Sequence, residues 1–231
     1  MIDISNWRHL YKINYESGLV GSTNMLYTPY ISDDGKTMCM WYDEKNPYQA
    51  ENKELSKELI DFFYGREVKY LTLLQSYSWA PKIRDIDEKN SRIYIEFNSE
   101  TLNHITMNPD RDIMQELPNW KEQVFSILSD IDTAGYYKLA LYPHCFFIDE
   151  NKQLKTIDFY SVIEKDNCQI ERSKIEGIIG SESTGRFDNS TVGDVIDFEI
   201  FFKTTMLHHL GQRWKDNPFP EFYKKLINHD V

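Results

Sequence analysis

The sequence is short of cysteine and has no long apolar run. Its three cysteines, Cys39, Cys145 and Cys168, are odd in number and far apart, and none belongs to a Cys-x-x-Cys pair. That spacing argues against both a disulfide framework and a zinc site. No stretch approaches the roughly 18 apolar residues of a membrane-spanning helix, and the first residues lack the apolar core of a signal peptide. We therefore expect a cytoplasmic protein.

Positive charge is scarce as well. The chain has 26 lysine and arginine residues against 37 aspartates and glutamates, which gives a formal net charge of −11. Binding to nucleic acid or to an anionic membrane depends on lysine and arginine, so neither is expected as a partner. An acidic surface suits solubility, and it also suits a basic protein partner.

Apolar and aromatic residues, by contrast, are plentiful. Hydrophobic residues make up 41% of the chain and aromatic residues 14%, including 15 tyrosines and 13 phenylalanines. This is ample for a core, and 231 residues suffice for one domain or for two closely packed lobes. The abundance of Asn, Lys, Ile and Tyr suggests an AT-rich genome of viral or bacterial origin.

The clearest local pattern is a hairpin that ends on a carboxylate. Two short apolar runs, 145–148 and 154–157, flank the polar tetrad 150–153, which predicts two strands and a turn. The second run is followed by Asp158 and Phe159. A carboxylate between a strand end and a loop is a natural ligand for a hard cation such as magnesium.

The residues before the hairpin are predicted to form a loop. Pro143 rules out a regular central strand or helix there, so His144 is expected to lie in this loop. An imidazole can accept a proton near neutral pH, which makes His144 a candidate base. The alternative is that His144 is a hydrogen-bonded structural group.

This order of elements resembles the protein-kinase-like fold, in the broad sense that includes small-molecule phosphotransferases. In that family a catalytic loop of the form H-x-D-x-x-x-x-N leads into a hairpin that ends in D-F-G. Asp158 matches the magnesium ligand, and Tyr160 stands where glycine is expected. Counting back, the metal-binding Asn position falls on Cys145, the catalytic Asp position on Ala140 and the preceding His on Lys138. The resemblance thus implies the architecture with much of its chemistry missing.

A glycine-containing turn precedes the first predicted strand. Gly18, Gly21 and Ser22 lie just before the strand predicted at 25–30. Such a turn can present backbone N–H groups to phosphates, and the resemblance places the family's glycine-rich loop here. The spacing departs from G-x-G-x-x-G, and an ordinary hairpin turn is the alternative.

The family's lysine and glutamate positions fall on Met40 and Glu67. Met40 lies in the strand predicted at 37–42, where a kinase carries its phosphate-pairing lysine; the alternative is that Met38 and Met40 face a core. Glu67 lies in a helical pattern at 51–77, which Gly65 would divide into two helices. With methionine at position 40 the glutamate has no partner, so a solvated helix charge is the alternative for Glu67.

The remaining pattern follows the family's lower-lobe order. Strands are predicted at 82–87 and 91–97, the second from its alternation. Later elements are a hinge-like connector at 98–102, an amphipathic helix at 120–133 ended by Gly135, a long polar run at 161–191, and a helix at 193–214. The resemblance implies that Asp194 or Asp197 anchors the backbone of the catalytic loop.

Together with these observations, the resemblance implies an α+β, two-lobed protein-kinase-like fold. Residues 1–98 would form an N-terminal lobe with a small antiparallel sheet, and residues 99–231 a mainly helical C-terminal lobe. The function expected is that of a pseudokinase, which binds a nucleotide such as ATP and acts through a protein partner. One alternative is an active, atypical phosphotransferase that uses Asp158, magnesium and His144; another is an α+β interaction module with no nucleotide site.

Overall fold

A computed structural model describes most of the first three quarters of the chain. The described residues are 2–10, 27–43, 57–102, 105, 110–111, 113–138 and 145–167. The chain divides into two compact units, the first made of residues 1–111 and 146–160 and the second of residues 112–145 and 161–231. The predicted α+β class is confirmed in its coarse form, because helices accompany a small antiparallel sheet. The predicted boundary after residue 98 and the two-lobed arrangement stay predictions.

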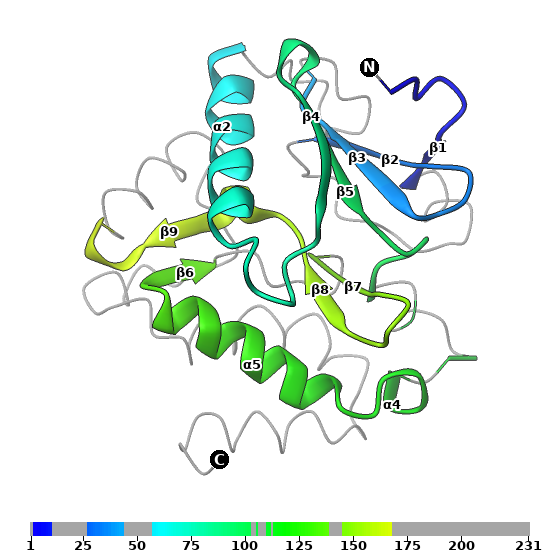
Figure 1. The fold of residues 1–231 in the computed structure, drawn as a ribbon, viewed down its shortest axis with the longest axis vertical. Helices are drawn as coiled ribbons and strands as arrows, with labels where there is room; N and C mark the ends of the chain where they lie inside the picture. Colours follow the sequence, from blue (N-terminus) through cyan, green and yellow to red (C-terminus); the bar gives the residue numbers. More distant parts are fainter. Residues whose placement is uncertain are drawn as a thin grey trace. The chain divides into compact units, whose positions relative to one another are not determined.

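A five-stranded antiparallel sheet forms the body of the first unit (Figure 1). Its strands lie in the order β1-β2-β3-β5-β4. They are β1 (Arg8–His9), β2 (Thr28–Ile31), β3 (Thr37–Trp41), β4 (Ile83–Asp87) and β5 (Arg92–Glu96). The last four overlap strands that the sequence predicts, at 25–30, 37–42, 82–87 and 91–97. The two-residue β1 was not predicted, because two residues carry no periodicity.

A tight turn at Gly35 joins β2 to β3. Gly35 has a φ of +72°, a conformation that glycine adopts without steric cost. A Cβ atom built there would lie 2.0 Å from Ser99 Oγ, and the Ser99 amide donates to the Gly35 carbonyl at 2.8 Å. The turn therefore requires glycine for its backbone and for the close approach of residue 99.

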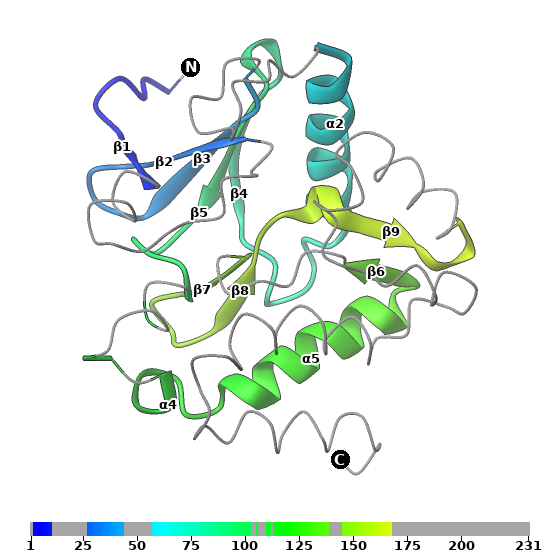
Figure 2. The same cartoon turned by 180° about the vertical axis from the view of Figure 1, so that it is seen from behind.

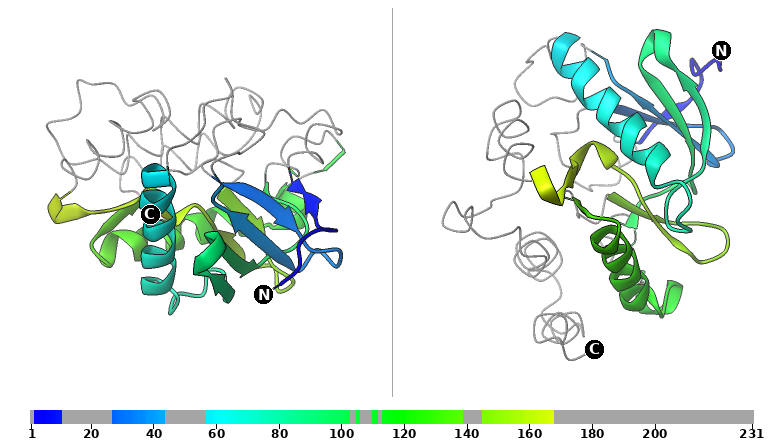
Figure 3. Two further views of the ribbon diagram at one scale, coloured as in Figure 1. Left: turned by 90° about the horizontal axis from the view of Figure 1, so that it is seen from above. Right: turned by 60° about the vertical axis from the view of Figure 1, so that its left-hand side comes forward.

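The two faces of the sheet are covered by different segments. Cys39 and Tyr94 face Ile4 of the N-terminal segment, while Met38 and Met40 are fully buried on the alternate side of β3. Figures 2 and 3 show α2 (Lys57–Leu73) along one face of the sheet and the N-terminal segment with β1 on the opposite side. The interpretation that Met38 and Met40 face a core is confirmed.

Helix α2 runs without interruption from Lys57 to Leu73, so the predicted division at Gly65 is wrong. A side chain at Gly65 would meet nothing within 4 Å, which shows that this position faces open space. Glycine costs a helix only about 1 kcal/mol relative to alanine. The buried residues Phe63, Tyr70 and Leu71 pack on both sides of it in sequence, and this packing outweighs that cost.

The predicted hairpin is confirmed as β7 (Phe146–Ile148) and β8 (Leu154–Thr156). It attaches to the sheet of the first unit at several points. The Asn98 amide donates to the Ile148 carbonyl at 2.8 Å, and the rings of Phe97 and Phe147 lie 4.9 Å apart. The buried Lys155 ammonium donates to the Ser78 carbonyl at 2.7 Å and lies 3.1 Å from the Glu96 carboxylate. The hairpin is therefore held rigidly against the sheet.

The second unit contains a helix and a short two-stranded sheet. Helix α5 (Trp120–Thr133) has the predicted bounds, and Gly135 follows it with a φ of +86°. Its buried side chains include Trp120, Val124, Ile127 and Ile131. The other elements of this unit are α4 (Ile113–Glu116), β6 (Tyr136–Lys138), β9 (Val162–Glu164) and the 3-10 turn η4 (Lys165–Asn167). Of the remaining 3-10 turns, η1 (Glu88–Asn90) belongs to the first unit, and η3 (Phe159–Ser161) begins at the end of that unit.

Strands β6 and β9 pair in antiparallel fashion and were not predicted. Each has three residues, and their pairing joins segments far apart in sequence, so no local pattern announces it. Among the described residues, no helix combines the length and the apolar character needed to cross a bilayer.

Candidate functional site

Asp158, the predicted metal ligand, is buried directly after β8. Only 1% of its surface is exposed, and its φ of +67° lies in the left-handed region. Aspartate tolerates a positive φ better than most residues do. A positive φ is nevertheless uncommon at residues other than glycine, and it often marks a functional position. The phenol of Tyr27 donates a hydrogen bond to Asp158 Oδ1 at 2.5 Å. The carboxylate is therefore turned inward, onto a side chain that comes just before β2.

Glu67 of α2 is fully buried, so its interpretation as a solvated helix charge is wrong. Its Oε2 atom accepts the backbone N–H of Tyr160 at 2.6 Å and the phenol of Tyr42 at 3.3 Å. The helix carboxylate thus binds the chain two residues beyond Asp158. Tyr42, which follows β3, links the sheet to the same Oε2 atom of Glu67.

The neighbouring residue of α2 completes a clamp on Tyr160. Arg66 Nε donates to the Tyr160 carbonyl at 2.9 Å, so consecutive helix residues hold the N–H and the C=O of one residue. The Tyr160 ring also packs edge-to-face on Phe63, with centroids 5.7 Å apart. Phe159, which lies between Asp158 and Tyr160 in sequence, is fully buried, and its ring stacks on that of Trp79. These contacts fix the backbone that carries Asp158.

Two tyrosine side chains cover the two carboxylates, and we call Tyr27 and Tyr42 the tyrosine pair. Their ring centroids lie 5.3 Å apart, and both side chains are buried. Burial raises the pKa of Tyr42 well above its usual range, and the nearby Glu67 and Asp158 add to that rise. Tyr42 therefore stays a protonated, neutral donor at any physiological pH.

The other predicted site residues have mixed positions. Met40 is buried in β3 and does not reach Glu67 as a hydrogen-bond donor; Tyr42, two residues later on the same side of the chain, takes that role. Cys145 and Lys138 are both buried within the second unit. Five further candidates lie outside the described residues: Gly18, Gly21, Ser22, Ala140 and His144.

The donor set around Asp158 does not suit a magnesium ion as it stands. Magnesium prefers octahedral oxygen ligands and is usually bound by one or two carboxylates with water and phosphate. Within the described ranges no group of three or more His, Cys, Asp and Glu side chains is arranged to hold a metal. The phenol of Tyr27 occupies an acceptor position on Asp158 Oδ1 and would compete with a cation for that atom. In the part of the chain described here, Asp158 thus engages a tyrosine where a kinase would place a metal.

Sequence reasoning found the two carboxylates and missed their partners. Tyr42 was within reach of the pattern, because it shares a strand face with Met40, the position at which the resemblance places the family's lysine. Tyr27 gave no such signal, since 131 positions separate it from Asp158. Arg66 acts through its contact with a backbone carbonyl, which leaves no mark on the sequence of its partner.

Comparisons with known proteins give a weak likeness. No protein-family model matches the chain, and no curated protein matches it. The chain is similar to a crystal structure of monomeric WbdD, with 14% identity and a TM-score of 0.45 over 68% of this chain and 37% of that one. It is similar to WbdD co-crystallised with the kinase inhibitor LY294002, with 14% identity and a TM-score of 0.46 over 87% and 48%.

A further structure, described as the bifunctional kinase-methyltransferase WbdD, shares 15% identity at a TM-score of 0.43, over 68% of this chain and 34% of that one. The chain thus spans less than half the length of each of these WbdD chains. The activities named for WbdD are those of that protein.

Proposed function

We propose that this chain is a degenerate kinase-like protein, a pseudokinase with two lobes, which acts by binding a protein partner. The observation that carries the proposal is the tyrosine pair. Phenols occupy both carboxylates on which a kinase depends, with Tyr42 on Glu67 and Tyr27 on Asp158.

The charges needed for phosphoryl transfer are missing at these two points. A protein kinase needs an ion pair between a strand lysine and a helix glutamate, and it needs magnesium on the aspartate of the D-F-G segment. Strand β3 contains no lysine, and the donor to Glu67 is a neutral phenol. A phenol cannot neutralise the charge on a transferring phosphate. The predicted position of the catalytic base reads Ala140, and a positioned base alone is worth about 10²–10⁴ in rate.

The internal order of the first unit supports the kinase-like part of the proposal. A small antiparallel sheet is followed by a helix whose buried glutamate binds the chain just after a hairpin aspartate. In the kinase family the helix glutamate and the D-F-G segment must likewise be placed together. Here the placement is kept while the cationic partner is replaced. A fixed arrangement without catalytic charges suits a protein that presents a surface to a partner.

A nucleotide could still bind, because much of its affinity comes from an apolar slot and backbone contacts rather than from metal. On this proposal ATP would bind without a requirement for magnesium. Such binding would make the nucleotide a regulator of shape rather than a substrate.

Phosphate transfer from labelled ATP in the presence of magnesium tests the proposal. The wild-type chain is compared with Asp158→Asn, which keeps the size of the side chain and an acceptor for Tyr27. We expect no transfer above background from either protein, to the chain itself or to added acceptors. Transfer by the wild type that Asp158→Asn abolishes would establish the alternative, an active atypical phosphotransferase.

That alternative is favoured by one observation, the left-handed backbone of Asp158. Strained residues often mark functional sites, and the clamp on Tyr160 holds the carboxylate in a defined place. Activity would require Tyr27 to withdraw from Asp158, so that magnesium could bind, and His144 to act as the base. His144→Gln and Asp158→Asn should then each remove the transfer. The third reading, an interaction module with no nucleotide site, predicts no thermal shift with ATP or GTP.

A further inference from the structure

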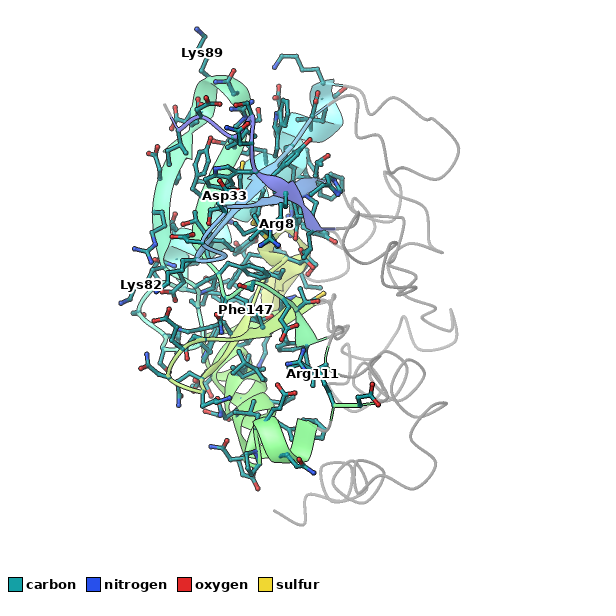
Figure 4. All side chains as sticks on the ribbon, turned by 90° about the vertical axis from the view of Figure 1, so that its right-hand side faces the viewer. Arg8, Asp33, Lys82, Lys89, Arg111 and Phe147 are labelled. Atoms are coloured by element: carbon teal, nitrogen blue, oxygen red, sulfur yellow. The ribbon has the colours of Figure 1, made fainter. Side chains whose placement is uncertain are left out.

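The five-stranded sheet ends at β4, which pairs with β5 on one side and is the last strand in the order of the described residues. The side chains of Arg84 and Asp85 in this strand are exposed. Figure 4 shows Lys82 and Lys89, which flank the strand, extending away from the ribbon. A strand at the edge of a sheet presents N–H and C=O groups that can pair with a strand of another chain. The hydrogen bonds on this side of β4 therefore decide what the edge can bind.

The register of β4 shows which of its N–H groups face the free edge. The Glu96 N–H donates to the Lys82 carbonyl at 2.8 Å, so residue 82 faces β5. Successive residues of an edge strand direct their backbone groups to opposite sides, so Ile83 faces the free edge. The register then shifts between Ile83 and Asp85, which adds one residue to β4. The next N–H on the free edge is therefore that of Ile86.

The side-chain amide of Gln75, which follows α2, occupies the edge at Ile83. Its Oε1 atom accepts the Ile83 N–H at 3.3 Å, and its Nε2 atom donates to the Pro81 carbonyl at 2.7 Å. In a parallel pair of strands the bonds are slanted, so that one residue bonds to the two residues on either side of the one it faces. The Gln75 amide thus makes both bonds that a residue of a parallel neighbouring strand would make.

Asp85 closes the second position. Its Oδ1 atom accepts the N–H of Ile86 at 2.9 Å, so both N–H groups on the free edge have an acceptor within the same chain. We call Gln75 and Asp85 the edge caps. Bulges and charged side chains are ordinary means by which proteins keep an edge strand from pairing. A strand that adds to β4 would have to displace both caps.

The sequence of β4 is complementary to itself, which makes a second copy of the chain the occupant that fits this edge. Two copies of β4 can lie antiparallel in a register that brings opposite charges together and leaves no like charges opposite each other. Its facing pairs would be Lys82–Asp87, Ile83–Ile86 and Arg84–Asp85. The same register places the outward N–H groups of residues 83 and 86 opposite each other, as a two-fold symmetric contact requires.

We propose that the edge caps close β4 to a second copy of the chain, and that β4 pairs with β4 of another copy when both caps are removed. The edge is thus a self-pairing surface that two side chains hold shut. None of these residues belongs to the tyrosine pair or contacts Asp158 or Glu67 through a hydrogen bond given above. The inference therefore goes beyond the proposed function and stands whether or not the chain binds a nucleotide.

Sedimentation velocity of the full-length chain over a series of concentrations tests the inference. The double variant Gln75→Ala with Asp85→Ala should dimerise roughly tenfold or more tightly than wild type, because each copy then offers two N–H groups that have lost their acceptors. Hydrogen exchange locates the contact. The amides of Ile83 and Ile86 should exchange more slowly as the concentration of the double variant rises, and wild type should show no such change.

The matched control is Gln75→Ala with Asp85→Asn. It has the same net charge as the double alanine variant but keeps an Oδ1 acceptor for Ile86, so it should dimerise more weakly than that variant. Thermal unfolding verifies that each variant is folded. If the double alanine variant does not fold, Asp85→Ala alone is compared with Asp85→Asn, and the alanine should give the tighter dimer.

Three results would overturn the proposal. The first is a folded alanine variant that dimerises no more tightly than wild type. The second is equal dimerisation of the alanine and asparagine variants, which would make the charge of Asp85 the cause rather than its hydrogen bond. The third is slower hydrogen exchange elsewhere in the chain with no change at residues 83 and 86.

Discussion

The two faces of the sheet hold their charged side chains in different ways. On the α2 face, Glu67 and Asp158 each accept a hydrogen bond from one member of the tyrosine pair. On the other face, the buried Nε of Arg92 has no acceptor among the described residues. A satisfied buried group stabilises the fold, whereas an unsatisfied one lowers stability unless something binds it. The comparison assigns the hydrogen bonds that join helix, sheet and hairpin to the α2 face.

The largest expected effect comes from Glu67→Ala. The substitution leaves the Tyr160 N–H and the Tyr42 phenol buried without their acceptor, so we expect a loss of about 2–4 kcal/mol in the free energy of unfolding. Urea denaturation measures it. Glu67→Gln keeps one carbonyl acceptor and should lose clearly less. If alanine and glutamine cost the same small amount, Glu67 is not the link between helix and hairpin.

Tyr27→Phe should have the next largest effect. It removes the donor to the buried Asp158 and keeps the ring, for an expected loss of about 1–3 kcal/mol. Since the phenol then no longer competes for Oδ1, magnesium should raise the melting temperature of the variant and leave that of wild type unchanged. Tyr27→Phe with Asp158→Asn should abolish the magnesium effect. A magnesium shift already present in wild type would contradict the role of Tyr27.

His9 sharpens the contrast from the Arg92 side, because it is a titratable group on β1 that contacts the ring of Tyr30. Burial lowers the pKa of His9 from 6.5 to about 4 in the folded chain. Between those pH values the unfolded chain binds more protons, so stability is complete above pH 6.5 and falls as the pH drops toward 4.

The test for His9 compares wild type with His9→Gln in urea at a series of pH values. The variant should lose less stability across this window, by on the order of 1–2 kcal/mol. Carboxylates titrate in both proteins, so their contribution cancels when the free energy of unfolding of the variant is subtracted from that of wild type at each pH. Parallel pH curves for the two proteins would show that His9 is not held neutral by the fold.

The smallest effect on stability is expected from Arg92→Gln. The Nε atom makes no hydrogen bond to a described residue, and the contact with Trp41 is worth about 0.5–1 kcal/mol. In urea denaturation, Arg92→Gln should lower the free energy of unfolding by less than about 1 kcal/mol, whereas Glu67→Ala should lower it much more. This difference would show that the two faces contribute unequally to stability. A loss as large as that of Glu67→Ala would make Arg92 a structural residue and remove the contrast.

The sequence predicts those parts of the fold in which a repeating pattern extends over several residues. The strands β3, β4 and β5, the β7–β8 hairpin and the whole of α5 follow from alternation or from helical spacing. Strands β1, β6 and β9 have two or three residues each and depend on partners distant in sequence. The division at Gly65 failed because packing outweighs the helix propensity of one residue.

The candidate site was predictable to a similar extent. Asp158 and Glu67 were found from their places in the order of elements, and their chemical surroundings were not. Both partners in the tyrosine pair are brought to the carboxylates by tertiary structure, across 25 residues for Tyr42 and 131 for Tyr27. The glycine-containing turn and His144 lie outside the described residues and stay predictions.

Calorimetric titration of ATP into the wild-type chain, with magnesium and then with EDTA, tests the central claim most directly. If the phenol of Tyr27 occupies Asp158, any ATP affinity should be the same in both buffers, and Tyr27→Phe should make it depend on magnesium. Wild-type affinity that requires magnesium and disappears in Asp158→Asn would contradict the account.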